Sequence, residues 1–146
     1  VHIVPLIADA VEDAKASSPE HTWLLQAEEP GFLVMADTAR LLQAVTNLLA
    51  NARLHTPPHT TVTTSVRRTG DRVTVTVCDD GPGIPPELVP TLFERFVRGD
   101  NSRSRSTGST GLGLAITRAI IEAHHGTITV VSQPGATCFT IELGVA

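Results

Sequence analysis

Two alternating runs on either side of a tight turn constrain the fold of this chain more than any other feature. Residues 61–67 and 72–79 alternate with period two, with valines at 62, 66, 73, 75 and 77, and Thr69-Gly70-Asp71 separates the two runs. Alternation with period two indicates strands that bury one face, and a short glycine-containing connection joins two strands as a hairpin. The sequence therefore predicts an antiparallel strand pair with one face in a hydrophobic core.

Helical periodicity predicts what covers that face. Apolar residues recur at helical spacing over 38–54, where Asp37 can cap the helix, and over 111–124, which Gly126 can end. Further helices are expected over 5–16 and, more briefly, over 90–97. The remaining expected strands are 23–27, 32–36, 127–132 and 137–143. These elements predict an α+β fold in which helices pack on one face of a sheet, a two-layer α/β sandwich in a single domain spanning 1–146.

Composition excludes several classes of protein. The net charge of −4 over 146 residues argues against nucleic-acid binding, and the short apolar runs predict no direct contact with a membrane. The first residue is not methionine, which suggests a fragment of a longer protein. Cys78 and Cys138 each lie in an alternating run, so we expect reduced cysteines in the core rather than a disulfide.

A polar stripe follows one side of the expected helix 38–54. Gln43, Asn47, Asn51 and His55 stand four residues apart and therefore lie nearly above one another on a helix. The stripe is either a solvated face or one side of a ligand site. Neutral amide oxygens suit a magnesium ion whose charge is met by phosphates, and amide N–H groups can donate to those phosphates.

Two glycine-containing segments are the other candidates for chemistry. Residues 79–84, DDGPGI, directly follow an expected strand. They form either an ordinary turn or a backbone segment that a flat ligand can approach closely. In the second case Asp79 can accept a hydrogen bond from an exocyclic amine such as that of adenine. Residues 111–114, GLGL, open a helix and expose N–H groups to an anion. The polar tract 99–110 before them has too little apolar surface to pack alone, so we expect it to be poorly ordered without a ligand.

Four stretches in this order resemble the N, G1, F and G2 boxes of the ATP-binding catalytic domain of bacterial two-component sensor histidine kinases: NLLANARLHTP, CDDGPGIP, LFERFVR and GSTGLGLAI. The resemblance covers nearly the whole chain and, within the family, suggests an actinobacterial member. It implies the Bergerat fold, a mixed and mostly antiparallel sheet with about three helices on one face.

The resemblance also implies roles for individual residues. Asn47 and Asn51 would be the catalytic residues, with Asn51 holding Mg²⁺, while Asn47 and His55 line the nucleotide and Asp79 binds the adenine amine. The tract between the F and G2 boxes would be the lid over ATP. The resemblance places these further residues at the ATP site: Gly81, Gly83, Ile84, Phe93, Arg98, Thr110, Gly111, Leu112, Gly113 and Leu114.

Three positions depart from the family pattern. Leu54 stands where a basic residue is common, Ser109 stands where a glycine is expected, and Gln43 stands where some members have glutamate. In addition, none of the six histidines lies in the phosphoacceptor setting His-Glu/Asp-x-x-x-Pro. The resemblance therefore implies a domain that positions Mg-ATP for a histidine on a separate dimerisation domain.

The partners and location follow from the same resemblance. They are the dimerisation domain of the same kinase and a response regulator, in a homodimeric protein that is anchored in the membrane while this domain is cytoplasmic. The alternatives are an anti-sigma-type serine kinase, a clamp ATPase like those of gyrase or Hsp90, and a binding module without catalysis.

Overall fold

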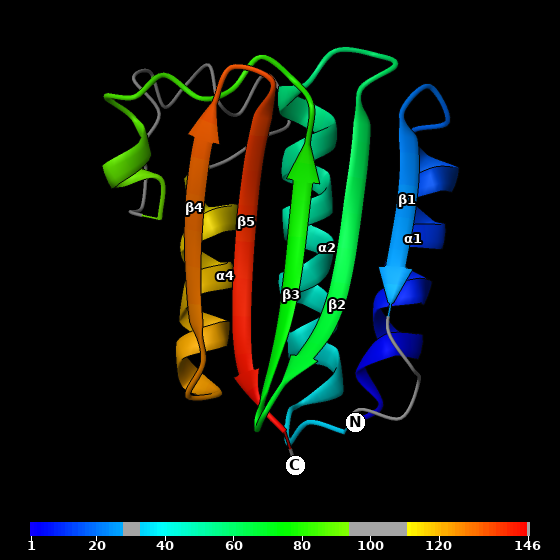
Figure 1. Ribbon diagram of the computed structural model, residues 1–146, viewed down its shortest axis with the longest axis vertical. Helices are drawn as coiled ribbons and strands as arrows, with labels where there is room; N and C mark the ends of the chain where they lie inside the picture. The colour runs from blue at the N-terminus through cyan, green and yellow to red at the C-terminus, as the bar shows by residue number, and fades with distance from the viewer. Residues whose placement is uncertain (28–32, 94–110, 146) are drawn as a thin grey trace.

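A computed structural model describes residues 1–27, 33–93 and 111–145 of the chain. Its centre is a five-stranded sheet with the order β1-β2-β3-β5-β4, in which β1 runs parallel to β2 and every other pair is antiparallel (Figure 1). The strands are β1 (Thr22–Ala27), β2 (Thr61–Thr69), β3 (Arg72–Asp79), β4 (Thr127–Gln133) and β5 (Ala136–Gly144). The predicted hairpin at 69–71 is therefore confirmed, and the expected strands 127–132 and 137–143 pair as a second hairpin.

Three α-helices in the described part of the chain lie together on one face of this sheet (Figure 1). They are α1 (Ile3–Ser17), α2 (Thr38–His55) and α4 (Gly111–Ala123), and a short 3₁₀ helix, η1 (Val89–Thr91), follows the loop after β3. The α2 helix begins as predicted, because the Asp37 side chain accepts a hydrogen bond from the Arg40 amide at 3.0 Å. The two-layer α+β fold expected from the sequence is confirmed.

The hydrophobic core lies between the two layers. Every second residue of β2, β3 and β5 faces the helices, and the apolar faces of α1, α2 and α4 cover them. The largest fully buried side chains are Ile3, Ile7, Leu41, Leu48, Leu49, Ile121 and Ile141. The other face of the sheet carries many polar side chains, among them Thr63, Thr74, Thr76 and Thr140, which explains why the alternating runs have one polar side.

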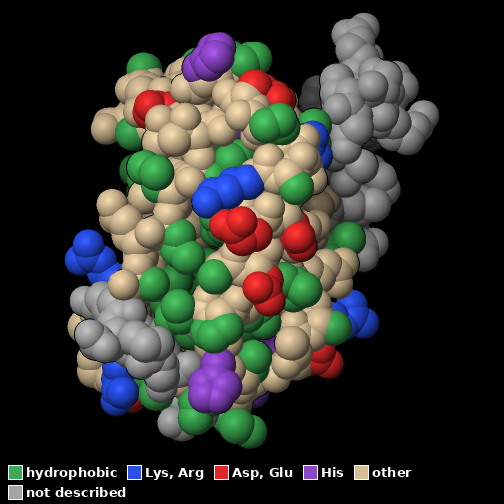
Figure 2. All heavy atoms as spheres, turned by 90° about the vertical axis from the view of Figure 1, so that its right-hand side faces the viewer, with side chains coloured by type: hydrophobic (Ala, Val, Ile, Leu, Met, Phe, Trp, Pro, Cys, Tyr) green, Lys and Arg blue, Asp and Glu red, His purple; other side chains and the backbone are tan. Residues whose placement is uncertain are grey.

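The α1 edge of the molecule carries mixed charge. Figure 2 shows basic and acidic side chains side by side over the middle of this face. On α1, Lys15 pairs with Glu12, with Nζ and Oε2 atoms 3.0 Å apart, and both side chains are exposed. Within residues 1–27, 33–93 and 111–145, no helix has the length and apolar character needed to cross a bilayer.

Two local predictions were wrong. The described part of the expected strand 32–36 forms only an isolated bridge, between Leu33 and His2. The apolar pattern there arises because Val34 is a buried core residue whose amide donates to the Val1 carbonyl at 3.0 Å. The expected helix 90–97 is replaced, over its described residues, by η1; its remaining residues lie outside the described part.

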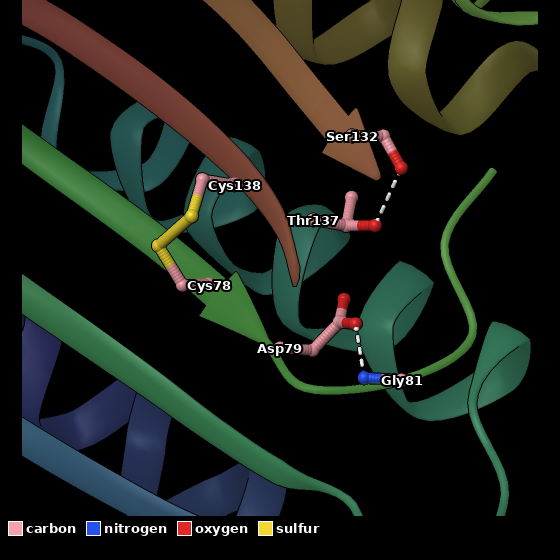
Figure 3. Close-up of a disulfide and its surroundings, with 6 residues drawn as sticks. All are labelled: Cys78, Asp79, Gly81, Ser132, Thr137 and Cys138. Carbon is pink, nitrogen blue, oxygen red and sulfur yellow. Dashed lines mark hydrogen bonds between the residues drawn. A yellow bond between two sulfur atoms is a disulfide. The ribbon is translucent and has the colours of Figure 1, made fainter. Parts of the chain in front are cut away.

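The prediction of reduced cysteines was also wrong, because Cys78 and Cys138 form a disulfide (Figure 3). The two residues are direct partners in the antiparallel register of β3 and β5, with Cα atoms 4.1 Å apart. Both lie on the face of the sheet opposite the helices, since Val77 and Phe139 beside them face the core. The alternation that placed the cysteines in strands therefore places them outside the core.

Candidate functional site

A cavity of about 170 Å³ opens where β3 ends, β5 begins and α2 ends. Its described walls are Asn51, Ala52, His55, Thr56, Asp79, Gly83, Ile84, Pro85, Leu88, Leu92, Leu114 and Thr137. Pockets for a whole drug-sized ligand are usually about 300–1,000 Å³, so these walls enclose only part of a nucleotide-sized molecule. Mostly apolar walls with a few polar groups suit a flat heterocyclic base.

Strand register places the polar groups of the cavity floor. Asp79 and Thr137 are direct partners in the β3–β5 pair and lie on the helix side of the sheet, one position from the disulfide (Figure 3). Thr137 Oγ1 lies 2.7 Å from Ser132 Oγ, which in turn accepts from the Ile84 amide at 2.8 Å. The β4–β5 hairpin therefore holds the loop after β3 in place.

The two adjacent carboxylates of DDGPGI have different surroundings. Asp80 is exposed, and its Oδ1 accepts from the Thr61 amide at 2.8 Å across the sheet. Asp79 is half-buried in the cavity wall, and its Oδ1 accepts from the Gly81 amide at 3.0 Å. Asp80 thus closes the end of the β2–β3 pair, while Asp79 is the carboxylate that faces the cavity.

Burial sets the electrostatics of Asp79. Removal from water raises the pKa of the Asp79 carboxyl above its ordinary value, although the hydrogen bond from the Gly81 amide opposes this effect. The charge of Asp80 raises this pKa further, whereas His21 lowers it. The ionised Asp79 carboxylate has lost part of its hydration, so a hydrogen bond donated by an N–H group of a ligand would stabilise its charged form.

The two glycines of this loop are required by contacts within the protein. A Cβ on Gly81 would lie 2.8 Å from Thr56 Cγ2, and a Cβ on Gly83 would lie 2.8 Å from the Gln133 carbonyl oxygen. Gly83 also has a φ of 90°, which favours glycine. The loop is therefore clamped between the end of α2 and the β4–β5 hairpin. Close approach by a ligand at these glycines stays a prediction.

The polar stripe of α2 divides between the cavity and a helix contact. Asn51 and His55 line the cavity, while Gln43 lies on an exposed part of the helix. Asn47 is not among the described wall residues, because its Nδ2 donates to the Gly113 carbonyl at 3.4 Å. Asn47 thus joins α2 to the first turn of α4, and its predicted contact with nucleotide is untested.

The predicted residues after Ile84 are distributed unevenly. Leu114 lines the cavity, and Phe93 packs edge-on against Phe139 of β5, with ring centroids 6.1 Å apart, so Phe93 supports the cavity floor. Gly111 and Leu112 begin α4, as expected for N–H groups at a helix start. Arg98, Thr110 and the expected lid 99–110 lie outside the described residues.

Sequence reasoning did not single out six of the described wall residues, Ala52, Thr56, Pro85, Leu88, Leu92 and Thr137. Leu88 and Leu92 stand four residues apart after a proline-rich loop, a spacing that could have marked them as one apolar face. Thr137 can be assigned to the cavity only when the register of β5 against β3 is known. Thr56 follows the last residue of α2 and lies in the stretch that resembles the N box, but only the fold shows that it lines the cavity.

Comparison with known proteins places this geometry in a family. Residues 36–146 match the family model described as "Histidine kinase-, DNA gyrase B-, and HSP90-like ATPase". The chain belongs to this family. Within it, the chain corresponds to the catalytic ATPase domain of two-component sensor histidine kinases.

Individual relatives agree with this assignment. The chain is 54% identical over 138 residues to the probable sensor histidine kinase TcrY of Mycobacterium tuberculosis and 44% identical over 146 residues to the sensor histidine kinase TrcS of the same species. These alignments cover 94% and 97% of this chain, but the histidine kinase domain described here spans only 29% and 28% of those relatives. The motifs also suggested the actinobacterial kinase PrrB, and the comparisons do not support that finer assignment.

Solved structures give the same fold. The mycobacterial sensor histidine kinase MprB superposes with a TM-score of 0.85 at 28% identity, over 99% of this chain and 95% of that one. Full-length ShkA in complex with AMPPNP gives a TM-score of 0.84 at 28% identity, over 100% of this chain and 30% of that one. The Bergerat architecture inferred from the motifs is therefore confirmed.

Proposed function

We propose that this domain binds Mg-ATP in the cavity between α2, the loop after β3 and the start of α4, and donates the γ-phosphoryl group to a histidine of a separate dimerisation domain. The observation that carries the proposal is the position of Asp79. It is a half-buried carboxylate at the end of the central strand, facing a mostly apolar cavity. The complex of ShkA with AMPPNP supports an adenine nucleotide as the ligand.

Asp79 would select the base by accepting a hydrogen bond from the exocyclic amine of adenine. Guanine carries an oxygen at the corresponding position and would be repelled by the carboxylate. Ile84, Leu88, Leu92 and Leu114 would cover the faces of the base, and Thr137 supplies a hydroxyl beside Asp79. The triphosphate would then extend toward the N–H groups at the start of α4.

The described residues fit a magnesium ion only together with the phosphates of the nucleotide. Asn51 is the amide in the cavity wall, and the described part of the chain contains no group of three His, Cys, Asp or Glu residues that could hold a metal unaided. One neutral oxygen ligand suits Mg²⁺ that keeps phosphate and water oxygens as its other ligands. Bound Mg²⁺ would neutralise charge on the transferred phosphoryl group.

In phosphoryl transfer the protein mainly positions the reactants and stabilises charge, so this domain needs no base of its own. The bond from the γ-phosphorus to ADP would break as a phosphorus–nitrogen bond forms on the acceptor. Two of the domain's own histidines are already engaged: His21 and His124 each have both ring nitrogens in hydrogen bonds. We infer that the acceptor lies in the remainder of a homodimeric, membrane-anchored kinase that passes the group to a response regulator.

The decisive experiment is the substitution Asp79→Ala, with ATP and GTP binding measured by calorimetry. A hydrogen bond to a charged acceptor contributes about 1.5–3 kcal/mol, so we expect ATP affinity to fall roughly 10- to 150-fold. Asp80→Ala is the matched control, because Asp80 is bonded to Thr61 outside the cavity, and it should leave affinity unchanged. Equal ATP affinity in Asp79→Ala and the unaltered domain would refute the adenine assignment.

Two further measurements address the metal and the reaction. Asn51→Ala should remove the gain in ATP affinity that Mg²⁺ produces while leaving binding of the base; an unchanged magnesium dependence would exclude Asn51 as a ligand.

Mixing the domain with a separately produced dimerisation domain and γ-labelled ATP should label a histidine of that partner. A label on serine would instead favour the serine-kinase alternative, and no transfer would favour a binding module.

A further inference from the structure

A buried histidine outside the cavity contacts one of its walls. His21 lies directly before β1 and is only 7% exposed. Its Nδ1 is 2.7 Å from Ser18 Oγ, and its Nε2 is 2.9 Å from Thr56 Oγ1. Thr56 lines the cavity, so a residue 35 positions earlier in the chain is in direct contact with the proposed nucleotide site.

Hydrogen counting fixes the direction of the bond between these two residues. The single hydroxyl hydrogen of Thr56 is directed to the Ala52 carbonyl oxygen, 2.6 Å away. Thr56 Oγ1 must therefore accept from His21, so Nε2 of the imidazole carries a proton. The Thr56 hydroxyl is held from two sides, by α2 and by the start of β1.

Thr56 also determines where the loop after β3 can lie. It is the residue that ends α2, with an extended backbone (φ −129°, ψ 151°), so helical hydrogen bonds do not fix it. Its methyl carbon occupies the space directly over Gly81, where a Cβ would approach it to 2.8 Å. The same amide of Gly81 donates to Asp79 Oδ1. A shift of Thr56 would therefore move the carboxylate that faces the cavity.

We propose that His21 is a positioning residue for the nucleotide, which acts by holding Thr56 against Gly81. The inference rests on the proposed function, since it concerns how Asp79 is placed for adenine. His21 touches no ligand in this scheme. The hydrogen bond from His21 to Thr56 places a wall of the cavity. The second hydrogen bond of His21, with Ser18, has a different role, because it joins the end of α1 to the start of β1.

The two nitrogens of His21 can be tested separately. In His21→Gln the side-chain amide can take the place of Nε2 and donate to Thr56, whereas in His21→Asn the shorter amide takes the place of Nδ1 and reaches only Ser18. Loss of one hydrogen bond of about 1 kcal/mol corresponds to about a fivefold change. We expect ATP affinity, measured by calorimetry with Mg²⁺, to fall about fivefold in His21→Asn and to change less than about twofold in His21→Gln.

Two other variants separate positioning from general loosening. Thr56→Val removes the hydroxyl but keeps the shape; it should weaken ATP binding as His21→Asn does, with no further loss in the double variant. Trp23→Phe removes the indole N–H that donates to the Ser18 carbonyl at 2.9 Å in the same junction, and it keeps an aromatic ring for the contact with the His21 imidazole, whose centroid lies 5.7 Å from that of Trp23. It should lower the melting temperature and leave ATP affinity unchanged.

Each result supports or overturns the inference. Equal affinities in His21→Asn and His21→Gln, or a loss in Trp23→Phe as large as in His21→Asn, would overturn it and leave the proposed function intact. An unaltered domain that fails to bind ATP would overturn both. If His21→Asn does not fold, Thr56→Val alone decides, because unchanged ATP affinity in that variant excludes the mechanism.

Discussion

Backbone hydrogen bonds join the chain ends to neighbouring segments at the bottom of Figure 1, whereas the top of the sheet combines backbone hydrogen bonds with hydrogen bonds to side chains beside the cavity. At the bottom, the Val34 amide donates to the Val1 carbonyl, and the Val145 amide donates to the Asp71 carbonyl. At the top, the carboxylate of Asp80 and the hydroxyl of Ser132 accept from backbone amides beside the cavity.

The difference shows how one fold separates stability from recognition. The backbone pairs at the bottom use groups that any sequence supplies. The top depends on particular residue types, because a carboxylate, a hydroxyl or a glycine has to stand at each contact. Substitutions at the contacts that hold the loop after β3, such as Gly83, should therefore change ligand binding, while substitutions at the bottom should change only the free energy of unfolding.

The largest effect is expected from the disulfide at the top end. It closes a segment with a sequence separation of 60 residues, and the entropy of such a loop corresponds to about 4 kcal/mol. Replacing both Cys78 and Cys138 with serine should lower the free energy of unfolding by about that amount in urea denaturation. A reductant should lower the stability of the unaltered domain equally and leave the variant unaffected; a domain insensitive to reductant would contradict the cross-link.

A smaller effect is expected at Gly83. Alanine there would combine a positive φ with a close contact to the Gln133 carbonyl, so we expect a loss of about 1–3 kcal/mol in the free energy of unfolding, together with weaker ATP binding. Gly135→Ala is the matched control, because Gly135 has a φ of 88° and open space around it. If both variants lose equal stability and retain ATP affinity, the clamp on the loop is not important for the site.

The helix cap at the bottom end provides the opposite case. Asp37→Ala removes the side-chain acceptor for the Arg40 amide and should lower the free energy of unfolding by about 1 kcal/mol. ATP affinity should stay the same, since α2 meets the cavity only at its other end. Asp37→Asn, which keeps an acceptor, should restore most of the stability. A change of ATP affinity in Asp37→Ala would break the separation between the two ends.

The smallest effect concerns the ionisation of Asp79. Burial raises the pKa of Asp79 in the folded state, so the folded state holds this proton more tightly than the unfolded chain and loses stability as the pH rises through that range. Asp79→Asn should therefore melt slightly higher than the unaltered domain at pH 7 while binding ATP poorly. The difference should shrink as the pH approaches the ordinary value of 3.8. A lower melting temperature at pH 7 would show that the carboxylate stabilises the fold.

Local patterns were sufficient to predict most of the fold. Period-two alternation located β2, β3 and β5, and helical periodicity located α1, α2 and α4, because each element buries one side against the same core. The end of α4 shows that a glycine can mark the end of a helix without adopting the left-handed backbone that usually explains it. Its left-handed residue is His125, with a φ of 62°, and Gly126 is required because a Cβ would meet the Glu142 carbonyl oxygen.

The site could be predicted only where its residues lie in motifs. Asn51, His55, Asp79, Gly83, Ile84 and Leu114 were expected and line the cavity. The pairing of Asp79 with Thr137 and of Cys78 with Cys138 depends on one register between strands far apart in sequence. The contact of His21 with Thr56 depends on the parallel placement of β1 beside β2. The alternation of apolar and polar side chains along a strand determines neither its register with a neighbouring strand nor the order of the strands in the sheet.

The central place of β3 in the sheet has a further consequence, for the rates at which parts of the domain open. A strand with hydrogen-bonded neighbours on both sides can exchange its amide hydrogens only when the sheet itself opens, whereas β1 and β4 can detach from an edge. Asp79 ends this strand, so the carboxylate proposed to recognise the base lies on a segment that has hydrogen-bonded neighbours on both sides. Brief opening of an edge strand would leave its position unchanged.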